Sequence, residues 1–173
     1  GYPSIEGMSL EFVQAESLLT ANLARSLLSG DRMAAEDAFV AGTLHDIGLL
    51  VLARHFPEGF PRVAKNCVEL GMPLSEAEEN EWGASHAQIG AYLLGLWGLP
   101  FRVVEAVAHH HDPRGISQSK LDVLGALHIA DALLNEAIAG HVGMPNPNAL
   151  APGFVASLGM ESRLPQWREL AEN

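Results

Sequence analysis

The sequence predicts an all-α fold, a compact bundle of about seven to nine helices. Apolar residues recur three or four positions apart along most of the chain, and no stretch shows the alternating pattern of a strand. With 173 residues, 48% of them hydrophobic, the chain is long enough to bury a sizeable core. These observations favour a single globular helical domain over residues 10–173.

The first half of the chain shows three helical segments. Residues 1–9 are expected to be a linker, or the remainder of a longer signalling protein, and not part of the domain. A helix is predicted over about 10–29, where Ser29-Gly30 ends it. A second is predicted over about 35–54, with His45 on its apolar face and therefore directed to the core. A third covers about 58–70 and stops at Gly71-Met72-Pro73.

In the second half, cap residues mark where helices begin. Ser75 with Glu78 resembles a capping box that opens a short acidic helix. Ser85 is expected to cap the next helix, which carries His86 in its first turn. Pro100 suits the first turn of a helix over about 100–111. Ser119 with Asp122 is expected to open a long helix to about 139, followed by one or two short helices.

Charge and cysteine content exclude several classes of protein. The net charge of −11, with only two lysines, argues against nucleic-acid binding and against docking on anionic lipid, both of which need clustered positive charge. The single cysteine, Cys67, excludes an internal disulfide and fits a reducing compartment. A membrane-spanning run and a signal peptide are both lacking. The expected location is therefore the cytoplasm.

The doublet His45-Asp46 is the most informative feature, because it lies in an otherwise apolar segment. Burying an imidazole and a carboxylate is costly unless a metal ion or hydrogen-bond partners compensate. These side chains are also common ligands of divalent metals. Two interpretations follow: a metal site, or a helix-interior pair satisfied by local hydrogen bonds.

Further candidate ligands follow the doublet, namely His86, the run His109-His110-His111, and Asp131 on the apolar face of its helix. Neighbours on a helix diverge by about 100°, so at most two of the three consecutive histidines face inward. His110 is the preferred inward residue and His111 the second. Metal sites in helical bundles are built in this way from facing helices. The alternative for the histidine run is a favourable interaction with the helix dipole.

These residues resemble the HD superfamily of metal-dependent phosphohydrolases, and within it the HDOD branch of bacterial signalling domains. The resemblance covers about residues 11–140 and is carried by five segments: Ala38-Phe-Val-Ala-Gly-Thr-Leu-His-Asp-Ile-Gly-Leu-Leu-Val-Leu, Gly83-Ala-Ser-His-Ala-Gln-Ile-Gly-Ala-Tyr-Leu-Leu, Trp97-Gly-Leu-Pro, His110-His-Asp-Pro and His128-Ile-Ala-Asp-Ala-Leu. It implies an HD-like bundle. It also implies His45, Asp46 and Asp131 as core metal ligands, with His86, His110 and His111 adding a second metal in multinuclear relatives.

Two departures from the family pattern bear on activity. HD hydrolases take a first histidine ligand from the helix before the doublet, and that helix has none here; Glu16 falls closest to its place and can ligate a metal. The Gly-Tyr-Pro signature of cyclic-dinucleotide phosphodiesterases is replaced by Asp112-Pro-Arg-Gly. This difference argues against hydrolysis of that type.

Two functions are consistent with the sequence. The first is an HDOD-like regulatory domain that contacts a signalling protein or a fused sensory or receiver domain, with metal optional. The second is a phosphohydrolase acting on a nucleotide or other phosphoester. In that case Asp46 is the expected catalytic residue, with Fe, Mn, Zn, Ni or Mg as cofactor. Arg102 and Arg114 either contact a phosphate or pair with carboxylates.

Overall fold

The computed structural model describes residues 10–142 and 149–172, and this part of the chain is helical with no strand. Ten α-helices and three short 3-10 turns follow one another along it: α1 (Leu10–Leu27), α2 (Arg32–Leu44), α3 (Ile47–His55), η1 (Pro57–Gly59), α4 (Phe60–Leu70), α5 (Leu74–Trp82), α6 (His86–Leu96), α7 (Phe101–His109), η2 (Pro113–Gly115), α8 (Val123–Val142), α9 (Phe154–Ser157), η3 (Glu161–Arg163) and α10 (Leu164–Glu172). The all-α prediction is confirmed. The expected linker at residues 1–9 lies outside the described residues.

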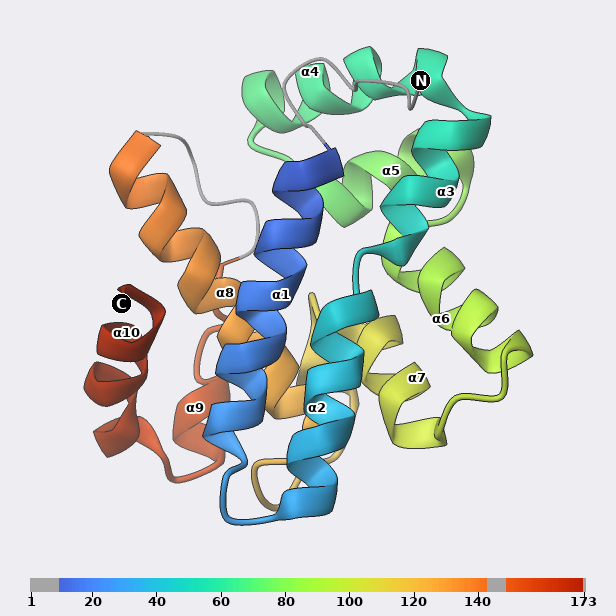
Figure 1. Ribbon diagram of the computed structural model, residues 1–173. Helices are drawn as coiled ribbons and strands as arrows, with labels where there is room; N and C mark the ends of the chain where they lie inside the picture. The colour runs from blue at the N-terminus through green and yellow to red at the C-terminus, as the bar shows by residue number, and fades with distance from the viewer. Residues whose placement is uncertain (1–9, 143–148, 173) are drawn as a thin grey trace.

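One large core holds most of these helices together. α1, α2, α7 and α8 pack around it, and α10 closes it with Trp167, which is only 1% exposed. α8 is buried along most of its described side chains, as its apolar sequence predicts. In Figure 1, α8 runs behind α1 and α2, with α6 and α7 on one side and α10 on the other. This arrangement brings the ends of several helices toward one point.

A second, smaller core lies beside the first. It consists of Leu49, Leu52, Ala53 and Phe60, with Trp82 and Ile89 packed against it. These residues come from α3 to α6, and Figure 1 shows α4 and α5 at the end of the molecule remote from α9. No helix in the described part of the chain is long and apolar enough to cross a membrane.

The single helix predicted over 35–54 is wrong, because the chain breaks at His45-Asp46 into α2 and α3. Asp46 has φ −97° and ψ 11°, outside the helical range. Tertiary packing accounts for the break. Gly48 lies so close to the main chain of His86 that a Cβ atom would collide with the His86 carbonyl. α3 therefore packs against α6, and His45-Asp46 lies at the junction between α2 and α3.

Two helix starts differ from prediction and one is confirmed. α5 begins at Leu74 after Pro73, without a side-chain cap, and Glu78 is fully buried instead of capping. The Asp122 carboxylate accepts from the Gly125 amide at 2.9 Å and opens α8 without Ser119. Ser85 caps α6 as expected, within a capping box completed by Gln88.

Candidate metal centre

The predicted ligands converge where five segments meet. His45 and Asp46 occupy the α2–α3 junction and His86 is the first residue of α6. His110 and His111 directly follow α7, while Asp131 lies within α8 and Glu16 within α1. Sequence positions 115 residues apart are thereby brought together. Each residue reaches the centre because its helix either ends there or passes beside it.

The Asp46 carboxylate lies between His45 and His86, and the Asp131 carboxylate lies beside His45. Asp46 lies 3.4 Å from His45, measured from Oδ2 to Nε2, and its Oδ1 lies 3.4 Å from His86 Nε2. The Oδ1 atom of Asp131 lies 3.7 Å from His45 Nε2. His45 and Asp131 are buried, with 1% and 5% of their side chains exposed. A solvent-shielded set of nitrogen and oxygen donors results.

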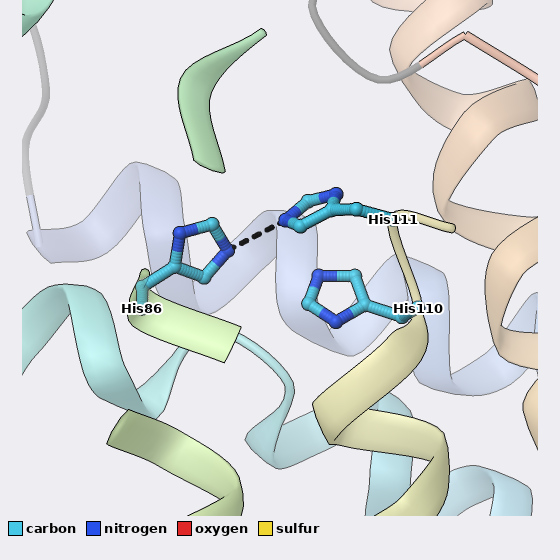
Figure 2. A group of neighbouring side chains, drawn as sticks. All are labelled: His86, His110 and His111. Carbon is cyan, nitrogen blue, oxygen red and sulfur yellow. Dashed lines mark hydrogen bonds between the residues drawn. The ribbon is translucent and has the colours of Figure 1, made fainter. Parts of the chain in front are cut away.

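The histidines form the other part of the cluster (Figure 2). His86 Nε2 and His111 Nε2 are 2.8 Å apart, and the rings of His110 and His111 lie 3.8 Å apart between centroids. His110 is buried, His111 half-buried and His109 exposed. The predicted order of inward orientation in this run is therefore confirmed.

Three of these imidazoles are oriented through Nδ1. His45 Nδ1 donates to the Gly42 carbonyl and His110 Nδ1 to the Val107 carbonyl, each at 2.8 Å. His86 Nδ1 lies 2.6 Å from a Glu78 carboxylate oxygen. A carbonyl or carboxylate oxygen only accepts, so Nδ1 carries hydrogen in each ring. In neutral rings this leaves the Nε2 lone pairs for a ligand, as in metal-binding histidines.

The described residues fit a divalent metal ion. Two groups have ligand atoms within 4.8 Å of one another: His86, His110 and His111, and His45, Asp46 and His110. His110 belongs to both, and its buried Nε2 atom has no hydrogen-bond partner among the described residues. Burial and the neighbouring histidines lower its pKa well below the ordinary value, which keeps the ring neutral. An unpaired buried lone pair among such donors is what a metal ion would satisfy.

Negative charge gathers around this centre. Burial, followed by the charges of Asp46 and Asp131, raises the pKa of Glu16 to about 7. Burial would lower the pKa of His45, but Asp46 and the hydrogen bond with Asp131 raise it to about 10. The carboxylates contribute to both shifts, after burial at Glu16 and against burial at His45, because clustered carboxylates disfavour a further negative charge and favour a positive one. A bound cation would relieve this repulsion.

Two residues beside the centre were not assigned from the sequence. Asn135 donates to Asp131 Oδ1 at 2.9 Å from the next turn of α8, and Glu78 bonds to His86. The spacing of four residues between Asp131 and Asn135 is a usable signal. For Glu78 the sequence holds no such signal, since its contact depends on how α5 packs on α6.

The remaining polar candidates have local partners. His128 Nδ1 donates to the His110 carbonyl at 2.6 Å and its Nε2 accepts from the Ala151 amide at 3.0 Å, so it joins core segments. Arg102 pairs with Asp37, and Arg114 forms a two-pronged pair with Asp112. These ion pairs confirm the simpler of the two interpretations for the arginines.

Three solved structures share this fold. A "Putative signal transduction protein" from Marinobacter aquaeolei VT8 has a TM-score of 0.70 at 25% identity and aligns with 98% of this chain and 38% of its own. A "Putative phosphohydrolase" from Shewanella amazonensis SB2B has a TM-score of 0.66 at 19% identity and aligns with 98% of this chain and 66% of its own. An HDOD domain protein of unknown function from Geobacter sulfurreducens has a TM-score of 0.65 at 20% identity. It aligns with 96% of this chain and 63% of its own.

Sequence comparison agrees with the fold. An uncharacterized protein of Treponema pallidum (strain Nichols) is 29% identical over 84 residues, which are 49% of this chain and 16% of that protein. The chain thus spans only part of the length of the proteins it matches. The HDOD domain model matches residues 3–113, well over half of the chain, including the doublet, His86 and both inward histidines. The chain belongs to the HDOD domain family.

Proposed function

We propose that this chain is an HDOD-type signal-transduction domain that holds a divalent metal ion in its core. His45, Asp46 and Asp131 are the expected principal ligands, with His86, His110, His111 and Glu16 available to complete the coordination. The observation that carries the proposal is the buried His110 Nε2 atom, shared by both ligand groups and without a hydrogen-bond partner in the described chain. Nitrogen and oxygen donors of this kind suit Fe, Mn, Zn or Ni better than Mg.

Three observations support a regulatory role. HDOD is the family of this chain, and the Marinobacter relative is named as a signal transduction protein. Arg102 and Arg114 are engaged in ion pairs, so these cations are not held ready for a substrate phosphate. The expected partner is a signalling protein or a fused sensory or receiver domain in the cytoplasm.

Metal content tests the site directly. The protein is purified without chelator or nickel affinity resin and measured by elemental mass spectrometry, beside a His45→Ala, Asp46→Ala double variant. His109→Ala is the matched control, because this neighbouring histidine is exposed. We expect near-stoichiometric metal in the wild type and the control, and none in the double variant. Absence of metal after reloading with excess Mn or Fe would contradict the site.

A metal-dependent phosphohydrolase is the second candidate. It is favoured by the proximity of the Asp46 and Asp131 carboxylates to His45, an arrangement that suits phosphoester hydrolysis. A divalent ion there would polarise a phosphoryl oxygen and lower the pKa of bound water. Asp46, beside His45 and His86, would be among the residues that hold the ion.

A phosphoesterase screen on the metal-loaded protein distinguishes the two functions. Turnover of a nucleotide or another phosphoester that disappears in Asp46→Asn would establish the hydrolase. A loaded protein without turnover supports the regulatory role. In that case, pull-down with signalling proteins encoded beside it is the next measurement.

A further inference from the structure

Glu78 is a buried carboxylate that faces the start of α6. Its side chain is 0% exposed, in a helix whose other acidic residues lie nearer the surface. Burial of a carboxylate is costly unless hydrogen bonds compensate. Its Oε2 atom accepts two, both from His86: the main-chain N–H at 2.8 Å and ring Nδ1 at 2.6 Å. Both of these hydrogen bonds thus tie Glu78 to His86.

We propose that Glu78 is a positioning residue, which fixes the His86 ring with hydrogen on Nδ1 and with Nε2 directed at the metal centre. This role rests on the proposed metal site. The Nε2 atom lies 2.8 Å from His111 Nε2 and 3.4 Å from Asp46 Oδ1. Figure 2 shows the His86 ring reaching toward His111 from the start of its helix. A ring with the other tautomer would place hydrogen where the lone pair is needed.

The two hydrogen bonds to one oxygen serve different purposes. The N–H groups of the first helical turn lack partners within the helix, and a negative charge there interacts well with the helix dipole. The bond to the main chain therefore anchors the carboxylate, and the bond to Nδ1 then sets the ring. His45 and His110 use main-chain carbonyls for the same purpose. A carboxylate makes the ring a stronger donor to a metal than a carbonyl does.

A purely structural role, docking α5 on α6 or capping α6, predicts a different result. The structure supplies matched controls for both possibilities. Glu79 accepts from Gln88 at 2.8 Å and joins the same two helices without touching His86. Ser85 caps α6 through the Gln88 amide. Glu79→Ala and Ser85→Ala remove these contacts and leave the Glu78–His86 pair in place.

The first measurement is the tautomer of His86 in the metal-free protein. Imidazole ¹⁵N shifts are recorded at mildly alkaline pH for wild type, Glu78→Ala, Glu79→Ala and Ser85→Ala. We expect hydrogen on Nδ1 in the wild type and both controls, and a shift toward Nε2–H in Glu78→Ala. Wild-type hydrogen on Nε2, or an unchanged tautomer in Glu78→Ala, would overturn the proposal.

The second measurement is the affinity for Mn²⁺ or Ni²⁺ by calorimetry, on variants whose folding is checked by circular dichroism. Loss of such an outer partner weakens metal binding by about 10–100-fold, and we expect this in Glu78→Ala but not in the controls. If Glu78→Ala does not fold, Glu78→Gln replaces it; it keeps the shape and loses the charge, and a smaller weakening is expected. If Glu78→Ala and Glu79→Ala lose metal affinity equally, Glu78 only holds α5 against α6, and the proposal is overturned. A wild type that binds no metal would contradict the proposed site, and the tautomer would still decide the role of Glu78.

Discussion

His110 combines full burial with an imidazole nitrogen that no described protein group satisfies. Such a group lowers stability, because a buried unpaired polar atom costs about 1–3 kcal/mol. The ring is nevertheless held by its Nδ1 bond to Val107. We propose that this position is retained to bind a ligand, since plain packing would favour an apolar residue there.

We predict that His110→Leu separates stability from metal binding. Leucine fills a similar volume and removes the unpaired nitrogen, so the metal-free variant should unfold within about 1 kcal/mol of the wild type. The wild type should gain about 2.7 kcal/mol at metal concentrations 100 times the Kd, and the variant should gain nothing. Thermal melts with and without excess Mn²⁺ measure both quantities. An equal metal-induced gain in the variant would contradict a ligand role for His110.

Glu16 offers a test of what burial and neighbouring carboxylates cost the metal-free protein. Its pKa is raised to about 7 in the folded state, so its ionisation opposes folding: stability falls as pH rises from its unfolded pKa of about 4.3 through 7. Glu16→Gln should therefore stabilise the chelator-treated protein at pH 8 by on the order of 1 kcal/mol, or about 2–4 °C in Tm.

The same variant should show little such advantage at pH 4, where the wild-type carboxyl is largely protonated in both states. Melts at the two pH values provide the measurement, and Glu11→Gln on an exposed part of α1 is the control. A gain for Glu16→Gln that does not change with pH would show that ionisation of the buried Glu16 carboxyl is not its cause. With Mn²⁺ present, Glu16→Gln should lose affinity if the carboxylate is a ligand.

At the scale of elements, the approach of α3 to α6 determines where the doublet lies. Gly48 stands against the main chain of His86, so the contact is backbone to backbone. His86 forms one side of this contact, and Asp46 lies two residues before Gly48 on the other side. The close packing of α3 on α6 therefore accounts for two features together. These are the break between α2 and α3 and the glycine at position 48.

Gly48→Ala should therefore be destabilising even though alanine favours helix. The added methyl group collides with a main-chain carbonyl that cannot rotate away, and overpacking of this kind costs about 1–3 kcal/mol. Gly95→Ala is the control: it lies in α6 with no atom near its Cβ position and should gain up to about 1 kcal/mol. Urea unfolding compares the two. A neutral Gly48→Ala would show that α3 and α6 can separate at little cost.

At the scale of the molecule, two cores of unequal size hold the chain. The large one joins α1, α2 and α6 to α10, and the small one joins α3 to α6, so α6 takes part in both. The candidate metal centre takes Glu16 and Asp131 from helices of the large core, His110 from the residue that directly follows α7, and His86 from α6. Metal binding would therefore strengthen the connection that α6 already makes between the two cores.

We predict that the helices of the small core open more readily than those of the large one. Segments with few buried apolar contacts exchange amide hydrogens through local opening, below the free energy of global unfolding. Amides of α4 and α5 should exchange faster than those of α8, and metal should slow exchange at the start of α6. Hydrogen exchange followed by mass spectrometry gives both comparisons. Uniform protection across α4, α5 and α8 would contradict a separable small core.

Much of the helical structure of this protein follows from local sequence pattern. The three-to-four spacing of apolar residues specifies helices, and Ser85 specifies the start of α6, because both depend on neighbours in the chain. The inward direction of His45, His110 and Asp131 follows from the same spacing. Their ligand role stays a prediction that the proposed experiments test.

Only the tertiary structure decided the rest. The break at His45-Asp46 arises because α3 turns to pack against α6, and a helical pattern in sequence does not reveal such a turn. Glu78 resembled a cap residue by its spacing from Ser75, yet it is buried against His86. Glu16 lies among the carboxylates because α1 crosses beside α8. Contacts between distant segments fix these outcomes, and their energies are set by burial and charge that no local pattern encodes.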